Sequence, residues 1–130
     1  MKHWRIGLVG CGWISEVYVK ALREVPGAEA VACCASSLES ARAFAERLGV
    51  PHACSDWREL VSRDDVDVVT VGVPNQLHHA VAIAALEAGK HVIIEKPLAL
   101  TLEECADIVE TSRRTGKGVG YAENLCFAPK

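Results

Sequence analysis

The chain has 130 residues, half of them hydrophobic, and a formal net charge of -3 at pH 7. This length suits one domain with a single core, and the weakly acidic balance without a Lys/Arg cluster argues against nucleic acid and membranes as partners. The apolar run at residues 6–9 is too short for a signal peptide or a membrane span, so we expect a cytoplasmic protein.

The first third of the chain predicts a strand, a glycine turn, a helix and a second strand. Residues 4–9 form an apolar run that breaks at Gly10-Cys11-Gly12, and a second apolar run covers 28–35. The first helix shows apolar residues at helical spacing: Ile14, Val17, Tyr18, Ala21, Leu22 and Val25. The helix after the second strand has a similar inward face, which comprises Ala41, Phe44, Ala45 and Leu48 and ends at Gly49.

The alternation of strands and helices continues to the end of the chain. We expect a short strand near 53, a helix over 57–61, a buried central strand over 66–73, a helix over 78–88, a strand over 91–95, a helix after Thr101, and a strand near 118–121. Thr101 and Glu104 form a capping-box signal, and the helix they open should turn Cys105, Ile108 and Val109 inward.

This pattern predicts an α/β fold, a doubly wound parallel sheet between two helix layers, as a single nucleotide-binding Rossmann domain over residues 1–130. Ligands of such sheets bind at the carboxyl ends of the strands. We therefore expect the site residues at the carboxyl ends of the strands.

The glycine turn has the composition of a pyrophosphate site. Gly10 permits the tight turn, Gly12 lets the backbone approach phosphates, and the amides of Trp13 and Ile14 open a helix toward the negative charge. Ser15 stands where Gly or Ala is usual, which strains close packing of helix on strand. The alternative is a glycine turn that holds no ligand.

The end of the second strand bears on which dinucleotide is bound. NAD-binding domains usually carry an Asp or Glu there, whereas this chain has Ala35, Ser36 and Ser37. Two hydroxyls without a carboxylate favour NADP over NAD, because hydroxyls can donate to a 2′-phosphate. A structural alternative, which can coexist, is that Ser36 caps the next helix through Glu39.

Cysteine and histidine give no sign of a metal site. The six cysteines are scattered through apolar segments without a CxxC spacing, and the five histidines form no ligand pattern. We expect reduced, structural thiols and no metal.

Three segments together resemble the glucose-fructose oxidoreductase, inositol dehydrogenase and MocA (Gfo/Idh/MocA) family: the turn at 10–12, the run PNQLH at 74–78, and the run GKHVIIEKP at 89–97. The resemblance implies an NAD(P)-dependent oxidoreductase that moves hydride between the cofactor and a sugar, polyol or related alcohol or ketone. It also implies a second, carboxyl-terminal domain, absent from these 130 residues, that carries the substrate site and the usual oligomer interface. Homo-oligomerisation is thus implied only by resemblance.

The resemblance also implies roles for the residues at the central strand ends. Lys96 would be the catalytic residue, with its ammonium on a substrate oxygen beside the nicotinamide ring. Pro97 would fix the backbone after Lys96 through a cis bond, and Glu95 would orient either Lys96 or the ribose. The remaining positions expected beside the cofactor are Pro74, Asn75, His78 and Asn124.

Structural roles stay open for some of these residues. Asn75 is a good helix cap, and His78 suits a first helical turn. The competing function is a nucleotide-binding module or fragment that binds the dinucleotide without turnover of its own.

Overall fold

The computed structural model describes residues 2–129, which form six strands, five α-helices and two short 3-10 helices. The elements follow in this order: β1 (Trp4–Val9), α1 (Trp13–Leu22), β2 (Ala28–Cys34), α2 (Leu38–Leu48), β3 (His52–Cys54), α3 (Trp57–Val61), β4 (Val68–Val71), η1 (Asn75–Leu77), α4 (His78–Glu87), β5 (His91–Glu95), α5 (Leu102–Thr115), β6 (Val119–Ala122) and η2 (Asn124–Phe127).

All six strands form one parallel sheet in the order β3-β2-β1-β4-β5-β6. The chain adds strands outward from β1 to β3, then crosses back and adds β4 to β6 on the other side of β1. This arrangement confirms the predicted doubly wound fold. It makes the boundary between β1 and β4 the point where the strand order reverses.

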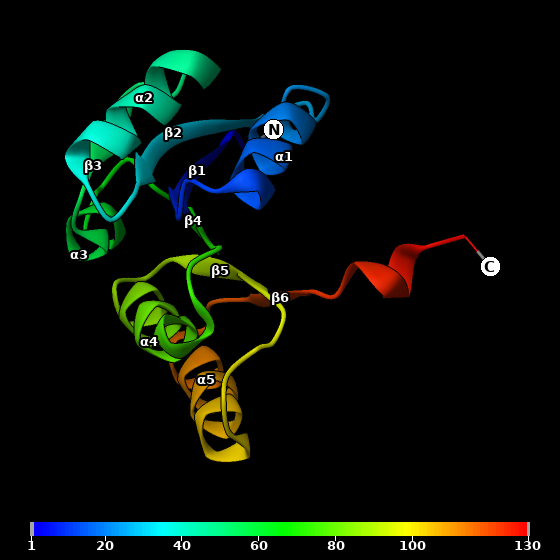
Figure 1. Ribbon diagram of the computed structural model, residues 1–130. Coiled ribbons are helices and arrows are strands. Elements are labelled where there is room, and N and C mark those ends of the chain that lie inside the picture. Colours follow the sequence, from blue (N-terminus) through cyan, green and yellow to red (C-terminus); the bar gives the residue numbers. More distant parts are fainter. Residues whose placement is uncertain (1, 130) are drawn as a thin grey trace.

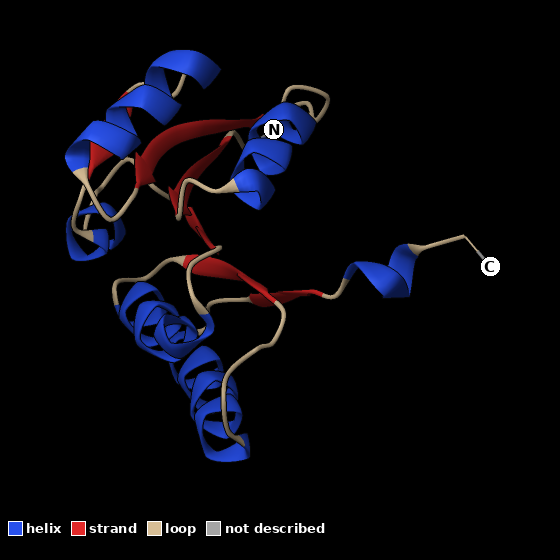
Figure 2. Cartoon of the chain, in the orientation of Figure 1, coloured by secondary structure: helices blue, strands red, loops and turns tan. Residues whose placement is uncertain are grey.

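Helices cover the sheet on both sides (Figures 1 and 2). One apolar cluster joins β1 and β2 to α1 and α2, and a second joins the opposite face of the sheet to α3, α4 and α5. Val68 belongs to the first cluster, whereas Val69 and Val71 belong to the second. Strand β4 is therefore buried on both faces, as its β-branched run predicted.

The start of α2 differs from the prediction that Ser36 caps this helix. Ser37, not Ser36, caps α2, because its Oγ accepts from the Ser40 amide at 3.1 Å. At α5, Thr101 accepts from the Glu104 amide as predicted, but the Glu104 carboxylate accepts from Leu100 rather than Thr101. Ser36 is left exposed and free of a capping role.

Within residues 2–129, no helix is long and apolar enough to cross a membrane. The same part of the chain contains no group of three or more His, Cys, Asp or Glu side chains arranged to hold a metal ion.

Candidate functional site

The glycine turn is shaped by contact with the end of β4. Gly10 has φ +109, and a Cβ built on it would lie 2.2 Å from the Gly72 carbonyl oxygen. The Gly10 amide donates to the Cys34 carbonyl at 2.9 Å. Only a residue without a side chain can adopt this conformation so close to the neighbouring backbone.

Gly12 leaves the start of α1 open. A Cβ built on Gly12 would meet no atom within 4 Å, and no side chain caps the helix there. The first-turn amides of α1 thus face open space, where a helix N-terminus attracts negative charge. Ser15 is buried on the inward side of α1 facing Gly72, whose missing side chain leaves it room, and its hydroxyl has no hydrogen-bond partner among the described residues. The residues present fit a pyrophosphate group.

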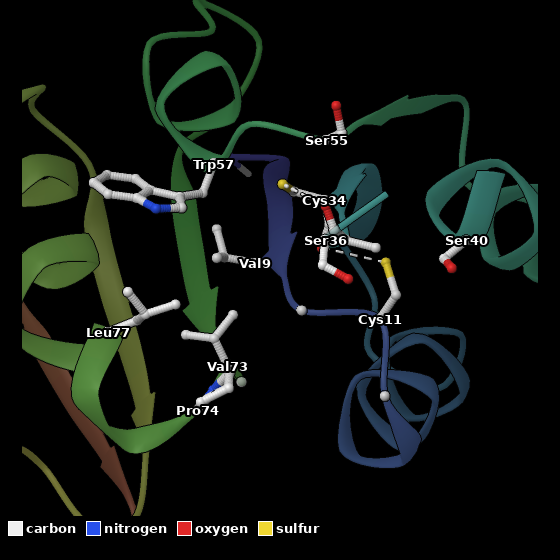
Figure 3. Close-up of a pocket in the computed structure, with 14 residues that line it drawn as sticks. Val9, Cys11, Cys34, Ser36, Ser40, Ser55, Trp57, Val73, Pro74 and Leu77 are labelled. Carbon is white, nitrogen blue, oxygen red and sulfur yellow. Dashed lines mark hydrogen bonds between the residues drawn. The ribbon is translucent and has the colours of Figure 1, made fainter. Parts of the chain in front are cut away.

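The first of two cavities beside the turn has a volume of about 480 Å³ and lies over the carboxyl ends of β1, β2, β3 and β4. Its walls differ in chemistry (Figure 3): Trp57, Leu77, Val73 and Pro74 form an apolar side, and Ser36, Ser40 and Ser55 bring hydroxyls from the opposite side. Its lining includes no carboxylate side chain. This cavity offers an apolar slot for a flat base next to a polar, uncharged edge.

Ser37 is excluded from that edge by its capping role. Its hydroxyl donates to the Ser40 Oγ at 2.9 Å while accepting from the Ser40 amide, and Ser37 does not line the cavity. The hydroxyls that do line it are those of Ser36, Ser40 and Ser55.

The second cavity, of about 600 Å³, lies on the other side of the turn, between α1 and the ends of β4, β5 and β6. Both cavities are lined by Gly72 and Val73, so they adjoin at the reversal of the strand order. The second is lined by Trp13, Ile14, Val17, Tyr18, Gly72, Val73, Asn75, His78, Glu95, Lys96, Ala122 and Asn124.

Glu95 is held by a tyrosine from α1. The Tyr18 hydroxyl donates to Glu95 Oε1 at 2.6 Å. Burial and this bond to Glu95 raise the pKa of Tyr18, so the phenol remains a donor at neutral pH. The carboxylate of Glu95 is therefore fixed on the inner wall of the second cavity.

His78 is buried, with 1% of its surface exposed. Its Nδ1 lies 2.7 Å from the Pro97 carbonyl oxygen, and its Nε2 lies 2.9 Å from the Val73 carbonyl oxygen. Both ring nitrogens thus face backbone oxygens of the chain itself, which leaves neither for proton transfer to a ligand.

Lys96 follows β5 directly, is exposed and lines the second cavity. The peptide bond between Lys96 and Pro97 is cis, as the resemblance implied. Across residues 2–129, the Lys96 amine has no hydrogen-bond or ion-pair partner. An ammonium in this position is available to an oxygen of a bound molecule.

The cysteines near the first cavity are protonated thiols. The Cys11 thiol donates to the Cys34 carbonyl at 3.4 Å (Figure 3). A hydrogen bond with Cys33 and burial raise the pKa of Cys11, and burial raises the pKa of Cys34 to about 12. Such thiols are poor nucleophiles at neutral pH.

The structure brings most of the sequence-predicted site residues to this crevice. Gly10, Gly12, Ser36 and Pro74 line the first cavity, and Trp13, Ile14, Asn75, His78, Glu95, Lys96 and Asn124 line the second. Ser37 and Pro97 line neither, although the Pro97 carbonyl contacts His78. Whether these residues contact a cofactor stays a prediction.

Sequence reasoning missed several lining residues. Ser55 follows β3, and the rule that ligands meet the carboxyl ends of parallel strands could have found it. Tyr18 was assigned only to the inward face of α1, yet a hydroxyl on such a face needs a partner. That need was the one available signal for its contact with Glu95.

The chain is similar in sequence to known oxidoreductases with a Rossmann fold. The model of the oxidoreductase family with an NAD-binding Rossmann fold matches residues 4–123. A 1,5-anhydro-D-fructose reductase from Ensifer adhaerens is 37% identical over 125 residues, covering 96% of this chain and 37% of the relative. A glycosyl hydrolase family 109 protein from Shewanella pealeana is 34% identical over 136 residues, covering 98% of this chain and 30% of the relative.

Solved structures agree with these relatives. A 3-ketoreductase from Actinomadura kijaniata, in complex with NADP and TDP-benzene, superimposes with a TM-score of 0.92 at 31% identity and covers 99% of this chain and 40% of that one. The chain thus spans less than half the length of each of these three proteins.

Proposed function

The chain belongs to the Gfo/Idh/MocA family of oxidoreductases with an NAD-binding Rossmann fold, and from this premise we propose that its crevice binds a nicotinamide dinucleotide for hydride transfer to or from a sugar, polyol or related alcohol or ketone. The observation that carries the proposal is the pair of cavities that adjoin at Gly72 and Val73 beside the glycine turn. A dinucleotide consists of two nucleotides joined by a pyrophosphate. It needs two cavities that meet at an anion site.

The chemistry of the two cavities supports a proposal that each holds one half of the cofactor. The adenine enters the apolar slot beside Trp57 and Leu77, and the adenosine ribose meets the hydroxyls of Ser36 and Ser40. The nicotinamide half occupies the second cavity, near Glu95 and Lys96. The first-turn amides of α1 take the pyrophosphate between them.

Lys96 is the proposed catalytic residue. Its Nζ hydrogen-bonds the reacting oxygen of the substrate: as an ammonium it would polarise a carbonyl and donate a proton to it, and as the neutral amine it would accept the proton of a hydroxyl. The bound nicotinamide ring supplies or accepts the hydride. Asn75 and Asn124 line the same cavity and supply amide groups that can bind the carboxamide of the nicotinamide or the substrate.

NADP is the proposed cofactor in preference to NAD. No carboxylate lines the first cavity where a 2′-phosphate would lie, and the Ser36 and Ser40 hydroxyls can donate to that group. The NADP in the related 3-ketoreductase supports this preference.

Titration with NADPH and NADH tests the proposal, with energy transfer from tryptophan to the reduced nicotinamide as the signal. We expect saturable binding of one dinucleotide per chain, with the smaller Kd for NADPH.

A panel of sugars and polyols then tests turnover in the chain and in a longer form extended by its downstream coding sequence. Lys96→Met in a form that turns over should lower kcat at least about a hundredfold with little change in cofactor affinity. Failure of both dinucleotides to bind at millimolar concentration would refute the proposal.

A second candidate is dinucleotide binding without turnover by these 130 residues alone. The coverage of 30% and 37% of the two curated relatives favours it. It is supported if the chain binds NADPH but turns over no member of the panel, whereas the extended form does. The substrate class and any homo-oligomer are part of the same proposal.

A further inference from the structure

Lys96 stands between two residues that are each tied to a helix on a different face of the sheet. We propose that Tyr18 and His78 are positioning residues that fix the backbone on both sides of Lys96 and so place its amine at the nicotinamide cavity. This inference rests on the proposed function, because it assumes that Lys96 serves a substrate oxygen there.

The first tie acts on the residue before Lys96. The Tyr18 hydroxyl of α1 donates to the Glu95 carboxylate at 2.6 Å, and both side chains are half-buried. The bond spans 77 positions in the sequence, so it fastens the end of β5 to the helix that begins at the glycine turn. A short hydrogen bond to a charged acceptor is among the stronger single contacts a side chain can make.

The second tie acts on the residue after Lys96. His78, at the start of α4, lies with Nδ1 2.7 Å from the Pro97 carbonyl oxygen and Nε2 2.9 Å from the Val73 carbonyl oxygen. Carbonyl oxygens only accept hydrogen bonds, and a neutral imidazole carries one N–H whereas an imidazolium carries two. A ring with its N–H on Nδ1, the nitrogen with the shorter contact, donates to Pro97 and so ties the loop after β5 to α4, and only the imidazolium would donate to Val73 as well.

Together the two ties hold the main chain around an otherwise free side chain. Lys96 is exposed, and its amine has no partner among residues 2–129. A flexible side chain reaches a reacting atom reproducibly only when its backbone is fixed by supporting contacts. Tyr18 and His78 supply that support from opposite faces of the sheet.

Conservative variants separate this role from general packing. Tyr18→Phe removes only the hydroxyl. His78→Asn places its amide nitrogen near the position of Nδ1 and so keeps a donor for Pro97, whereas His78→Gln places it near Nε2 and keeps a donor for Val73. The asparagine and glutamine variants differ in which loop remains tied. His78→Asn is therefore the matched control for His78→Gln.

The first readout is the reactivity of the Lys96 amine, mapped by mass spectrometry after brief acetylation, with Lys117 near the amino end of β6 as internal reference. In the unaltered chain we expect NADP⁺ to protect Lys96 by about tenfold or more, and 2′,5′-ADP, which fits only the first cavity, to protect it by less than about threefold. Tyr18→Phe and His78→Gln should reduce the protection by NADP⁺ to less than about threefold, and His78→Asn should retain it. The Kd for 2′,5′-ADP should not change in any variant.

The second readout needs no cofactor. Amide hydrogen exchange at residue 96 and residues 98–100 should be faster by about tenfold in Tyr18→Phe and His78→Gln than in the unaltered chain or His78→Asn. Equal exchange in all four proteins, or equal behaviour of His78→Asn and His78→Gln, would overturn the inference. Failure of NADP⁺ to bind the unaltered chain would instead overturn the proposed function, while the exchange result would still decide whether the two ties exist.

Discussion

Gly10 and Gly12, two positions apart in the glycine turn, are required for different reasons. A methyl group on Gly12 would meet no protein atom within 4 Å, whereas one on Gly10 would lie 2.2 Å from a backbone oxygen. We expect Gly12→Ala to keep the free energy of unfolding within about 1 kcal/mol of the unaltered chain. The same variant should weaken NADPH binding by about tenfold or more, because the methyl fills the space a phosphate must enter.

Gly10→Ala is the comparison for that variant, and it should lose about 3 kcal/mol or more of stability from backbone strain and overlap. Denaturant unfolding and NADPH titration measure the two quantities separately. A Gly12→Ala protein with unaltered affinity would show that phosphates do not approach this turn.

Ser36 and Ser37, which follow β2, should affect different properties: Ser36 the choice of cofactor and Ser37 the stability of the fold. Ser36→Asp places a carboxylate at the edge of the first cavity, where it would repel a 2′-phosphate, so we expect the preference for NADPH over NADH to fall by about tenfold or to reverse. Ser37→Ala should cost about 1 kcal/mol of stability through the lost cap of α2 and leave the preference unchanged. Paired titrations with both dinucleotides provide the measurement. An unchanged preference in Ser36→Asp would place the adenosine ribose elsewhere.

Sequence reasoning worked best for single residues that follow strands. Lys96 and Asn75 were assigned through the family resemblance, and the rule that the carboxyl ends of parallel strands share one edge of the sheet agrees with their place in the second cavity. Tyr18 and Ser40 were not found as site residues, because their places depend on how α1 and α2 lie across the sheet. The choice between Ser36 and Ser37 as cap also lay beyond the sequence, because either hydroxyl can begin the helix.

At the scale of elements, the length of a strand depends on the neighbouring strand it pairs with, which residue preferences alone do not predict. The β-branched run at 66–73 predicted a longer strand than Val68–Val71. Ladder pairing covers four residues because Ile6–Val9 of β1 is the matching stretch, and the chain turns away at Gly10. On α5, Val109 is exposed and Thr111 is buried, since Ile108 and Thr111 share the inward side three positions apart.

An ion pair joins the amino ends of β1 and β4, the strands that flank the crevice. The Arg5 guanidinium donates to both carboxylate oxygens of Asp67, at 3.0 Å from Nε and 2.9 Å from a terminal nitrogen. These bonds hold the pKa of Asp67 well below its usual range. Because the folded-state pKa is the lower one, this stabilisation is complete above the unfolded value near pH 4 and is lost as the pH falls below it.

We therefore expect Asp67→Asn to lower the free energy of unfolding by about 1 kcal/mol at pH 7, since Arg5 is partly exposed to solvent. The loss of stability between pH 5 and about pH 2 should be shallower than in the unaltered chain. Urea unfolding at a series of pH values measures both effects. Asp64→Asn, at an exposed neighbouring position, is the control. Parallel pH profiles for Asp67→Asn and the unaltered chain would contradict the assignment.

At the scale of the whole molecule, the crevice joins the two halves of the sheet. One half contains β1 to β3 and the other β4 to β6, and they meet only through the pairing of β1 with β4 within the sheet. A dinucleotide across both cavities would touch the turn after β1 and the ends of β2, β4 and β5, which lie far apart in the sequence. Such a ligand binds the folded chain only.

NADPH at about a hundred times its Kd should accordingly add about 2.7 kcal/mol of stability and raise the Tm by about 10 °C for a chain of this size. Hydrogen exchange should slow at the ends of both halves at once, whereas 2′,5′-ADP should leave the loop at residues 96–100 unprotected because it reaches only the first cavity. Protection confined to the β1–β3 half with the full dinucleotide would mean that the nicotinamide does not enter the second cavity. In that case Lys96 would have no reacting ring beside it, and the catalytic role proposed for its amine would be lost.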